Sequence, residues 1–193
     1  MQRRIKSNRR PLKKTADAIK EFLSQPERLV FFFDEGRFGL MPQVGKYWAR
    51  KATRPLTQVK PGYRNFYIYA SVSPCAEETF SLFLPWVNTD MMNLYLEELS
   101  NAYSQKRIMV IMDQAGWHKS KDLRVPSNIT ILPLPAYSPE LNPVEKLWQW
   151  LRRHVCRNRL FDSEEALQNE LINSLRELNN GKLLSLCHCH YLL

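Results

Sequence analysis

The sequence predicts a mixed α/β fold, in which helices flank a β-sheet. Two continuous apolar runs, Leu29 to Phe33 and Ile108 to Met112, are typical of strands buried on both faces. Strand-like segments come first and then alternate with segments of helical periodicity, an order that favours one mixed sheet. The 193 residues are also enough to bury a hydrophobic core without disulfides or a structural metal.

The first half of the chain predicts one helix and several strands. A short helix over residues 15–25 precedes a strand from Arg28 to Asp34, which a turn at Gly36 is expected to close. Aromatic and β-branched residues then predict further strands over residues 38–50, 63–73 and 79–86. These strands would build most of the sheet before the first long helix.

The second half alternates helices with strands. The periodicity predicts a helix from Asn88 to Ser104, followed by strands over residues 107–113 and 128–134. A turn-rich stretch, PLPAYSPELNP, leads into a helix with Asn142 as a good N-cap, Pro143 at the first position and Glu145 at the third. A last helix, Ser163 to Leu178, begins with a capping pattern, and no element is predicted beyond Asn179.

The charge distribution indicates a polyanionic partner. Lys and Arg number 28 against 19 Asp and Glu, which gives a net charge of +9. Residues 1–14 contain seven of these basic residues and no acid, and such arms bind polyanions through counterion release. We expect residues 1–26 to be a basic arm with a short helix, the remnant of a linker, and residues 27–193 to be a catalytic domain with a C-terminal helix. A purely solubilising tail is the alternative for the arm.

Composition excludes several classes of protein. The proportions of apolar and charged residues, 44% and 24%, rule out wholesale disorder, collagen and coiled coils. The longest apolar runs are far shorter than the ~20 residues of a membrane helix, and no apolar stretch follows the basic N-terminus as in a secretory signal. Four cysteines do not form a secreted disulfide pattern, and the contiguous Cys187-His-Cys-His190 does not suit a tetrahedral zinc site.

Three acidic residues fall where functional sites are usually assembled. Asp34 and Asp113 each follow an apolar run, and Glu145 opens a helix. Carboxylates brought together repel one another unless cations lie between them, and two Mg²⁺ ions can clamp the oxygens of a phosphoryl displacement. Alternatively, the aspartates are turn residues and Glu145 belongs to a capping box. Because neighbouring residues of a strand point to opposite faces, only one of Asp34 and Glu35 enters the site, and we favour Asp34.

Three motifs resemble those of a known family. Residues 31–39 (FFFDEGRFG), residues 112–120 (MDQAGWHKS) and residues 132–153, which include SPELNPVE, resemble the three signatures of the DDE transposases of mariner-related bacterial insertion sequences, in the family's order. The resemblance implies a ribonuclease-H-like mixed sheet and a triad of Asp34, Asp113 and Glu145 that holds two Mg²⁺ or Mn²⁺ ions. It also implies double-stranded DNA as substrate, cleavage by water, strand transfer by the freed 3′-hydroxyl, a TA target and a homodimer on paired transposon ends.

Within this implied triad, Asp34 would bridge both ions, Asp113 would hold one and Glu145 the other. The chain departs from the family at Gln114, where many relatives have Asn. Fewer than about thirty residues precede the first strand, too few for the family's helix-turn-helix modules. A separate helix-turn-helix polypeptide or an upstream reading frame is then expected to read the transposon ends. We expect a bacterial cytoplasmic protein that associates with the nucleoid and with no membrane.

The residues expected to contact DNA lie in the basic arm, after Asp113 and after Glu145. They are Arg9, Arg10, Lys13, Lys14, Trp117, His118, Lys119, Arg152 and Arg153. A core position for Trp117 and a solvated helix face for the two later arginines are the alternatives. Two other functions stay open: a catalytically inactive, truncated transposase remnant that only binds DNA, and another ribonuclease-H-like nuclease that acts on RNA–DNA hybrids or DNA junctions.

Overall fold

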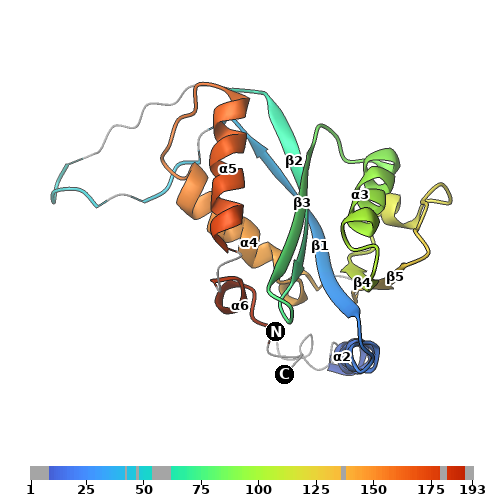
Figure 1. The fold of residues 1–193 in the computed structure, drawn as a ribbon. Helices are drawn as coiled ribbons and strands as arrows, with labels where there is room; N and C mark the ends of the chain where they lie inside the picture. Colours follow the sequence, from blue (N-terminus) through green and yellow to red (C-terminus); the bar gives the residue numbers. More distant parts are fainter. Residues whose placement is uncertain are drawn as a thin grey trace.

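A five-stranded sheet in the order β3-β2-β1-β4-β5 forms the centre of the molecule (Figure 1). The computed structural model describes residues 9–41, 43–46, 48–53, 62–135, 138–178 and 182–189. The strands are β1 (Arg28–Gly39), β2 (Asn65–Ser73), β3 (Glu78–Leu84), β4 (Arg107–Met112) and β5 (Ile129–Pro133). The helices are α2 (Arg9–Leu23), α3 (Thr89–Ala102), α4 (Val144–Leu151), α5 (Glu164–Leu178) and α6 (Lys182–Leu186). Short turns of helix are η1 (Gly116–Lys119), η2 (Pro139–Leu141) and the π-helical η3 (Arg152–Cys156).

The sheet is mixed, as predicted. The central strand β1 runs antiparallel to β2 on one side and parallel to β4 on the other. Phe32 of β1 thus lies opposite Val72 and beside Ile111. The β2–β3 pair is antiparallel and the β4–β5 pair is parallel, which completes a ribonuclease-H-like arrangement.

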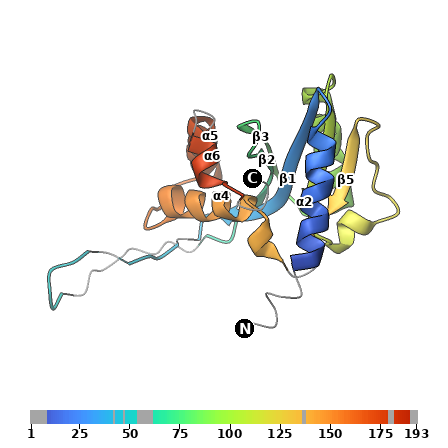
Figure 2. The same ribbon diagram turned by 90° about the horizontal axis from the view of Figure 1, so that it is seen from below.

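Helices cover both faces of the sheet, and each face has its own core. Alternate residues of β1 serve the two cores because side chains alternate along a strand. Phe32 packs in the cluster that includes α4, α5 and α6, whereas Phe31 and Phe33 pack in the cluster that includes α3. Figure 1 shows α4 and α5 on one side of β1 and α3 on the other. Figure 2 shows α2 beside β1, where it buries Ile19 in the first cluster.

The central strand is longer than predicted, because β2 pairs with it as far as Gly39. The predicted turn at Gly36 is wrong, since Gly36 lies within β1 opposite Ile68. A Cβ atom on Gly36 would come within 2.9 Å of the Trp148 indole, so glycine is needed here for the close approach of α4. Asp34 is therefore an interior residue of the strand instead of its last residue.

Between β1 and β2 the chain makes a long excursion, whose described residues 43–46 and 48–53 we call the arm. The strand predicted over residues 38–50 is wrong beyond its first two residues, because the arm forms no strand in its described part. The base of the arm is nevertheless fixed to the chain after η3. The Asn158 N–H donates to the carbonyl oxygen of Gln43 at 2.9 Å. Figure 1 shows the arm extending away from the sheet.

The helices follow the prediction with shifts at their ends. α2 begins at Arg9 instead of residue 15, and α3 begins after Asn88, whose Oδ1 accepts the Met91 N–H at 2.8 Å. The helix that follows the turn-rich stretch changes into a π-helical turn at Arg152. The short helix α6 occupies part of the tail for which no element was predicted. Among the described residues, no helix has the length and apolar character needed to cross a membrane.

Asn142 fastens the start of α4 to the central strand. Its Nδ2 donates to the carbonyl oxygen of Phe33 at 2.8 Å, and its Oδ1 accepts the Val144 N–H at 3.1 Å. The prediction of Asn142 as the N-cap is wrong by one position, because α4 begins at Val144 and Pro143 is its N-cap, but the Asn142 side chain still accepts the first N–H of the helix. The contact ties α4 to the residue that directly precedes Asp34.

We expect Asn142→Ala to lower the free energy of unfolding by about 1–3 kcal/mol. The substitution leaves a buried carbonyl oxygen and a buried N–H without their partner, and each such loss carries a desolvation cost. Urea unfolding followed by circular dichroism measures the change. Asn101→Ala, at an exposed position of α3, is the control and should stay within about 0.5 kcal/mol of the wild type. An Asn142 variant as stable as this control would show that the tie contributes nothing.

Candidate active site

The strand register brings the chain segments of Asp34 and Asp113 close to each other. β1 and β4 are parallel neighbours, paired as far as Phe32 and Ile111. Asp34 lies two residues beyond this pair on β1, and Asp113 lies two residues beyond it, directly after β4. Because neighbouring strands lie about 4.8 Å apart, we expect the two backbone positions to lie near each other at the C-terminal end of β4.

Asp34 is a largely buried carboxylate that an indole holds in place. The Nε1–H of Trp148 donates to its Oδ2 at 2.9 Å. Burial raises the pKa of Asp34 to about 7; the Trp148 hydrogen bond opposes this rise, and the charges of Glu35 and Glu145 add to it. A cation beside Asp34 would therefore relieve both its desolvation and the repulsion from its acidic neighbours.

Glu145 lies in the first turn of α4, three residues before Trp148. Residues three apart share a helix face, so Glu145 stands on the side of α4 whose indole reaches Asp34. The Glu145 N–H donates to the Asn142 carbonyl oxygen at 3.2 Å, but among the described residues no hydrogen bond runs from the Asn142 N–H to the Glu145 carboxylate, so the structure shows no capping box.

Asp113 is more open to solvent, but one of its oxygens is already engaged. Its Oδ1 accepts the Ala115 N–H at 3.0 Å and lies 2.9 Å from Nδ1 of His118. The His118 hydrogen bond lowers the pKa of Asp113, burial opposes this, and the Ala115 N–H adds to the lowering. The Asp113 side chain remains 61% exposed. It is therefore an ionised carboxylate with a fixed orientation at the end of β4.

His118 and Glu35 form a buried pair on the face of β1 opposite to Trp148. Nε2 of His118 lies 3.0 Å from Oε1 of Glu35, and their side chains are only 3% and 8% exposed. Burial lowers the pKa of His118, but the hydrogen bonds to Asp113 and Glu35 outweigh it and raise the pKa to about 9. The ring is then an imidazolium at neutral pH. The predicted separation of the two neighbouring acids is observed, since Asp34 contacts Trp148 and Glu35 contacts His118.

The donor set suits a hard divalent cation. Nowhere in the described ranges do three Asp, Glu, His or Cys side chains converge closely enough to hold one ion. Mg²⁺, however, is commonly bound through one or two carboxylates, with water and phosphate oxygens completing its octahedron. Asp34 paired with Asp113, and Asp34 paired with Glu145, each offer two carboxylates. The residues therefore fit a site of two ions that share Asp34, and they do not fit a single all-protein cage.

Of the other residues predicted as DNA contacts, the structure describes the side chains of four. Lys13 and Lys14 are exposed on α2, and Arg153 is exposed on η3, whereas the Arg152 guanidinium lies 5.4 Å from the centroid of the Phe38 ring. The side chains of Arg9, Arg10, Trp117 and Lys119 lie outside the described residues. At the C-terminus, Cys187 and Cys189 are buried in the core, and His190 lies outside the described residues.

Two residues of the site escaped the sequence analysis. Trp148 is one of the apolar residues that recur along α4 with helical spacing, and it is buried, but its indole N–H also donates to Asp34, which that spacing does not indicate. Glu35 was set aside as the acid on the wrong face, yet it holds His118. The signal for Glu35 was present in its strand position next to Asp34. Nothing in the sequence shows that a histidine 83 residues later meets it.

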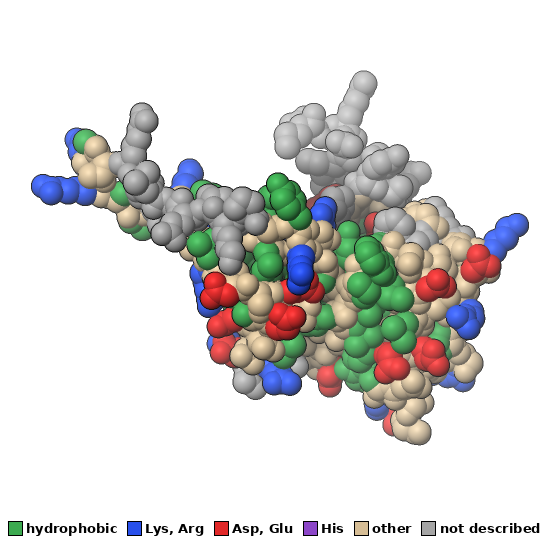
Figure 3. Space-filling view, turned by 90° about the horizontal axis from the view of Figure 1, so that it is seen from above, with side chains coloured by type: hydrophobic (Ala, Val, Ile, Leu, Met, Phe, Trp, Pro, Cys, Tyr) green, Lys and Arg blue, Asp and Glu red, His purple; other side chains and the backbone are tan. Residues whose placement is uncertain are grey.

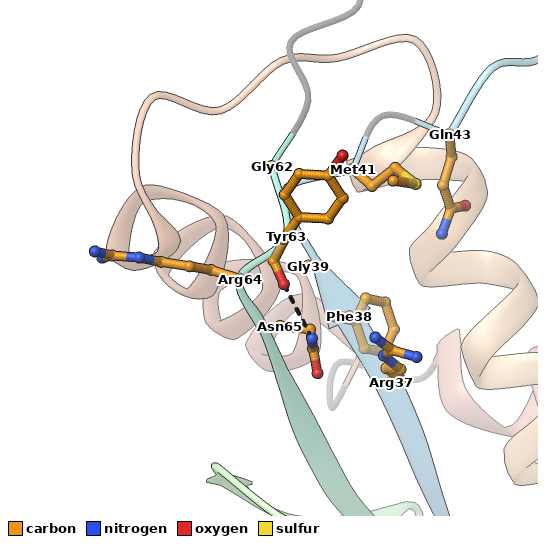
Figure 4. Close-up of a pocket in the computed structure, with 9 residues that line it drawn as sticks. All are labelled: Arg37, Phe38, Gly39, Met41, Gln43, Gly62, Tyr63, Arg64 and Asn65. Carbon is orange, nitrogen blue, oxygen red and sulfur yellow. Dashed lines mark hydrogen bonds between the residues drawn. The ribbon is translucent and has the colours of Figure 1, made fainter.

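An open pocket of about 390 Å³ lies at the C-terminal end of β1, at the base of the arm. Figure 4 shows its lining, in which Tyr63 lies beside Met41 and Arg64 extends away from the other side chains. The Nδ2 of Asn65 donates to the carbonyl oxygen of Tyr63 at 3.2 Å. Arg37 contributes a second guanidinium from the same strand that carries Asp34.

Residues 29–168 match the family described as DDE superfamily endonuclease. An uncharacterized protein of Sinorhizobium fredii is 42% identical over 96 residues, which cover 49% of this chain and 71% of that protein. The Tc3 transposase of Caenorhabditis elegans is 32% identical over 106 residues, 51% of this chain and 32% of the transposase. A 39 kDa protein of insertion element IS630 from Shigella sonnei is 29% identical over 140 residues, 68% of this chain and 40% of that protein. The matched regions thus span less than half the length of the transposase and the insertion-element protein.

Solved structures of the Mos1 transposase share the fold. A pre-cleavage Mos1 transpososome superimposes with a TM-score of 0.67 at 18% identity, over 92% of this chain and 58% of the Mos1 chain. A Mos1 paired-end complex with Mn gives the same TM-score of 0.67 at 19% identity, over 93% of this chain and 60% of that one. At this identity the likeness establishes a common ribonuclease-H-like fold.

Proposed function

The chain belongs to the DDE superfamily of endonucleases, and on this basis we propose that it is the catalytic domain of a DNA transposase. In this proposal it cuts DNA strands with water, in the presence of two Mg²⁺ or Mn²⁺ ions, and joins the freed 3′-hydroxyl to target DNA. The similarity to the Tc3 transposase and to an insertion-element protein supports the assignment. Mos1 has been solved in paired-end complexes with Mn and with Mg, which supports the choice of ions.

One observation carries the proposal. Asp34, a largely buried carboxylate on the central strand, feels the charge of Glu145 from α4, and a third acid, Asp113, directly follows the neighbouring parallel strand. Burying a carboxylate beside other acids costs free energy, which the fold has no structural reason to bear. Divalent cations bound between these acids would offset that cost. We therefore assign Asp34, Asp113 and Glu145 as the metal-binding and catalytic residues.

The roles of the three acids follow from their positions. Asp34 lies on the strand that pairs with β4 and feels the charge of Glu145, so we propose it as the residue that both ions would share, with Asp113 completing one site and Glu145 the other. When bound, the ions would supply the positive charge that polarises the scissile phosphate and favours deprotonation of the attacking water. The chain itself orients the ligands, through the Trp148 indole on Asp34 and through Ala115 and His118 on Asp113.

We also assign the arm to the DNA-binding surface. Residues 36–76 contain seven Lys and Arg and no Asp or Glu. In the arm, Lys46, Arg50 and Lys51 are exposed, and Trp48 between them is fully exposed as well. Figure 3 shows basic side chains at the far end of this extension, on the left of the view. Basic side chains interleaved with an exposed aromatic ring suit the phosphates and bases of nucleic acid.

The remaining parts of the proposal concern the partners. We propose double-stranded transposon ends as the substrate, because Mos1 has been solved as a transpososome and as a paired-end complex with a transposon end. The resemblance of the three motifs to mariner-related transposases supports a TA dinucleotide as the target and a homodimer as the active form. The exposed Lys13 and Lys14 of α2, together with Arg153, would extend the phosphate contacts. A separate helix-turn-helix polypeptide would recognise the terminal sequences of the transposon.

A plasmid-nicking assay tests the proposal directly. Supercoiled plasmid is incubated with the full chain and Mg²⁺, Mn²⁺ or a chelator, and the open-circular product is measured over time. We expect product with either ion and none with the chelator. Nicking that proceeds equally well in the chelator would contradict a metal-dependent mechanism. Cleavage of an RNA–DNA hybrid in preference to the plasmid would point to a different ribonuclease-H-like nuclease.

The second candidate function is a catalytically inactive remnant that only binds DNA. The observation that favours it is the lack, among the described residues, of three acids close enough to hold one ion. This candidate predicts retardation of DNA in a gel without nicking in any metal. The same plasmid and the same protein preparation therefore separate the two functions.

A further inference from the structure

A buried histidine connects two acids that come from different strands. Nδ1 of His118 lies 2.9 Å from Oδ1 of Asp113, and its Nε2 lies 3.0 Å from Oε1 of Glu35. His118 itself belongs to the short helical turn η1, which directly follows β4. With its side chain only 3% exposed, the ring is part of the interior. This position differs from the surface contact with DNA that the sequence suggested.

The two oxygens of Asp113 are used unequally. Oδ1 accepts the Ala115 N–H at 3.0 Å and also contacts the His118 ring nitrogen. Within the described residues, Oδ2 has no hydrogen-bond partner, although the side chain is 61% exposed. A carboxylate that is held through one oxygen presents the other in a fixed direction. Hydrogen bonds from neighbouring residues orient metal-binding carboxylates in this way.

The histidine ring is fixed from its far side as well. Glu35 engages Nε2, and the ring packs edge-on against Phe33, with 5.7 Å between the ring centroids. Glu35 can do this because strand alternation turns it away from Asp34, towards the core face that includes α3. The two adjacent acids of β1 thus have different partners: Asp34 contacts the Trp148 indole, and Glu35 contacts the His118 imidazole.

We propose that His118, anchored by Glu35, is a positioning residue that holds the Asp113 carboxylate for a divalent cation and contacts neither the cation nor the DNA itself. This inference rests on the proposed function, because it assigns the support of one of the proposed metal ligands. It gives Glu35 a role as the anchor of His118. It also explains why an acid and a histidine are both buried at this point.

Two substitutions of His118 separate its two contacts. In His118→Asn the side-chain amide lies near the place of Nδ1, so a donor to Asp113 is retained while the contact with Glu35 is lost. In His118→Gln the amide lies near the place of Nε2, so the contact with Glu35 is retained while the donor to Asp113 is lost. Binding of Mn²⁺ to the full chain without DNA, measured from the electron paramagnetic resonance signal of the free ion, gives the dissociation constants.

We expect His118→Gln to weaken Mn²⁺ binding by about 10–100-fold, the effect usual when a metal ligand loses the hydrogen bond that orients it. The Mn²⁺ dissociation constant of His118→Asn should be closer to that of the wild type than the dissociation constant of His118→Gln is. Equal dissociation constants for both variants and the wild type, or equal losses in both variants, would overturn the proposal. His154→Ala removes an exposed histidine that hydrogen-bonds the Trp150 carbonyl oxygen, and it should leave Mn²⁺ binding unchanged.

The anchor is tested with a second matched pair. Glu35→Gln keeps an acceptor for Nε2 of His118, whereas Glu35→Met fills a similar volume without one. We expect Glu35→Met to weaken Mn²⁺ binding more than Glu35→Gln does. If Glu35→Met binds Mn²⁺ as tightly as Glu35→Gln, then Glu35 does not act through His118. Thermal unfolding of each variant by circular dichroism shows that the compared proteins are folded.

The outcomes for this inference and for the proposed function are distinguishable. A wild-type chain that binds Mn²⁺ but does not nick plasmid contradicts the proposed activity, while the four variants still decide the role of His118. A wild-type chain that nicks plasmid, with Mn²⁺ affinities unchanged in the variants, supports the activity and rejects the positioning role. A wild-type chain that does not bind Mn²⁺ rejects both.

Discussion

Replacing Asp34 with asparagine is expected to abolish metal-dependent nicking, with a loss of about 10³-fold or more in rate. Asp34 is the ligand that both ions would share, and the charge stabilisation that metal ions provide is worth several kcal/mol. Each 1.4 kcal/mol of lost transition-state stabilisation lowers the rate tenfold. The initial rate of open-circle formation at saturating Mg²⁺ measures the effect. Asp113→Asn and Glu145→Gln should lose activity in the same way.

The loss of activity should not come with a loss of stability. The pKa of Asp34 is raised to about 7 in the folded chain, above its value in the unfolded chain, mainly because the carboxylate is buried. An acid with a raised pKa lowers stability as pH rises towards that value, and the full cost is present above it. Asparagine is neutral at every pH, so in metal-free buffer at pH 8 the variant should unfold at the same temperature as the wild type or higher.

Matched controls and DNA binding complete this experiment. Asp90→Asn and Glu98→Gln remove exposed acids of α3 and should nick at the wild-type rate. Retardation of plasmid fragments in a gel should be preserved in all variants, because the basic residues at the N-terminus and those of the arm between β1 and β2 are unchanged. A chain with Asp34→Asn that still cuts at the wild-type rate would refute the assignment of Asp34 and, with it, the proposed active site.

Replacing Trp148 with alanine is expected to have the largest effect on stability, about 3–5 kcal/mol. Trp148 is 1% exposed and packs over Gly36 in the core, so its removal leaves a large cavity. The midpoint of thermal unfolding should fall by roughly 6–20 °C for a domain of this size. Differential scanning calorimetry or circular dichroism measures the midpoint. For a domain with a total stability of about 5–15 kcal/mol, such a loss is severe.

Trp148→Phe separates packing from the hydrogen bond. Phenylalanine keeps most of the buried ring but has no N–H for Oδ2 of Asp34. We expect it to cost less stability than alanine and to weaken Mn²⁺ binding by about tenfold or more, because Asp34 loses the donor that orients it. If Mn²⁺ binds equally well to the phenylalanine variant and to the wild type, the indole contributes only to core packing and does not orient Asp34.

The sequence alone predicted the parts of the fold that local patterns encode. The uninterrupted apolar runs predicted β1 and β4 as buried strands, because a strand covered on both faces has no polar side. Asn142 was predicted as a cap, and its Oδ1 accepts the N–H of Val144. Strand alternation also predicted that Asp34 and Glu35 would point to opposite faces, and each has its own partner there.

Other features depended on residues that are distant in the chain. Gly36 has the local signature of a turn, but β2 supplies the hydrogen bonds that continue the strand through it, and Trp148 requires the missing side chain. The arm has aromatic residues typical of a strand, yet its base is held by Asn158, more than a hundred residues later. No local pattern reports such partners.

The candidate site shows the same division. The order and spacing of three acids, and their places relative to apolar runs and a helix start, were determined by the sequence itself. Only the tertiary structure decided that an indole supports Asp34 and that an imidazole joins Glu35 to Asp113. The physical reason is that a hydrogen bond depends on positions in space to within a fraction of an ångström. Those positions are set by the packing of whole elements, whereas a sequence pattern records only which face of its own element a residue occupies.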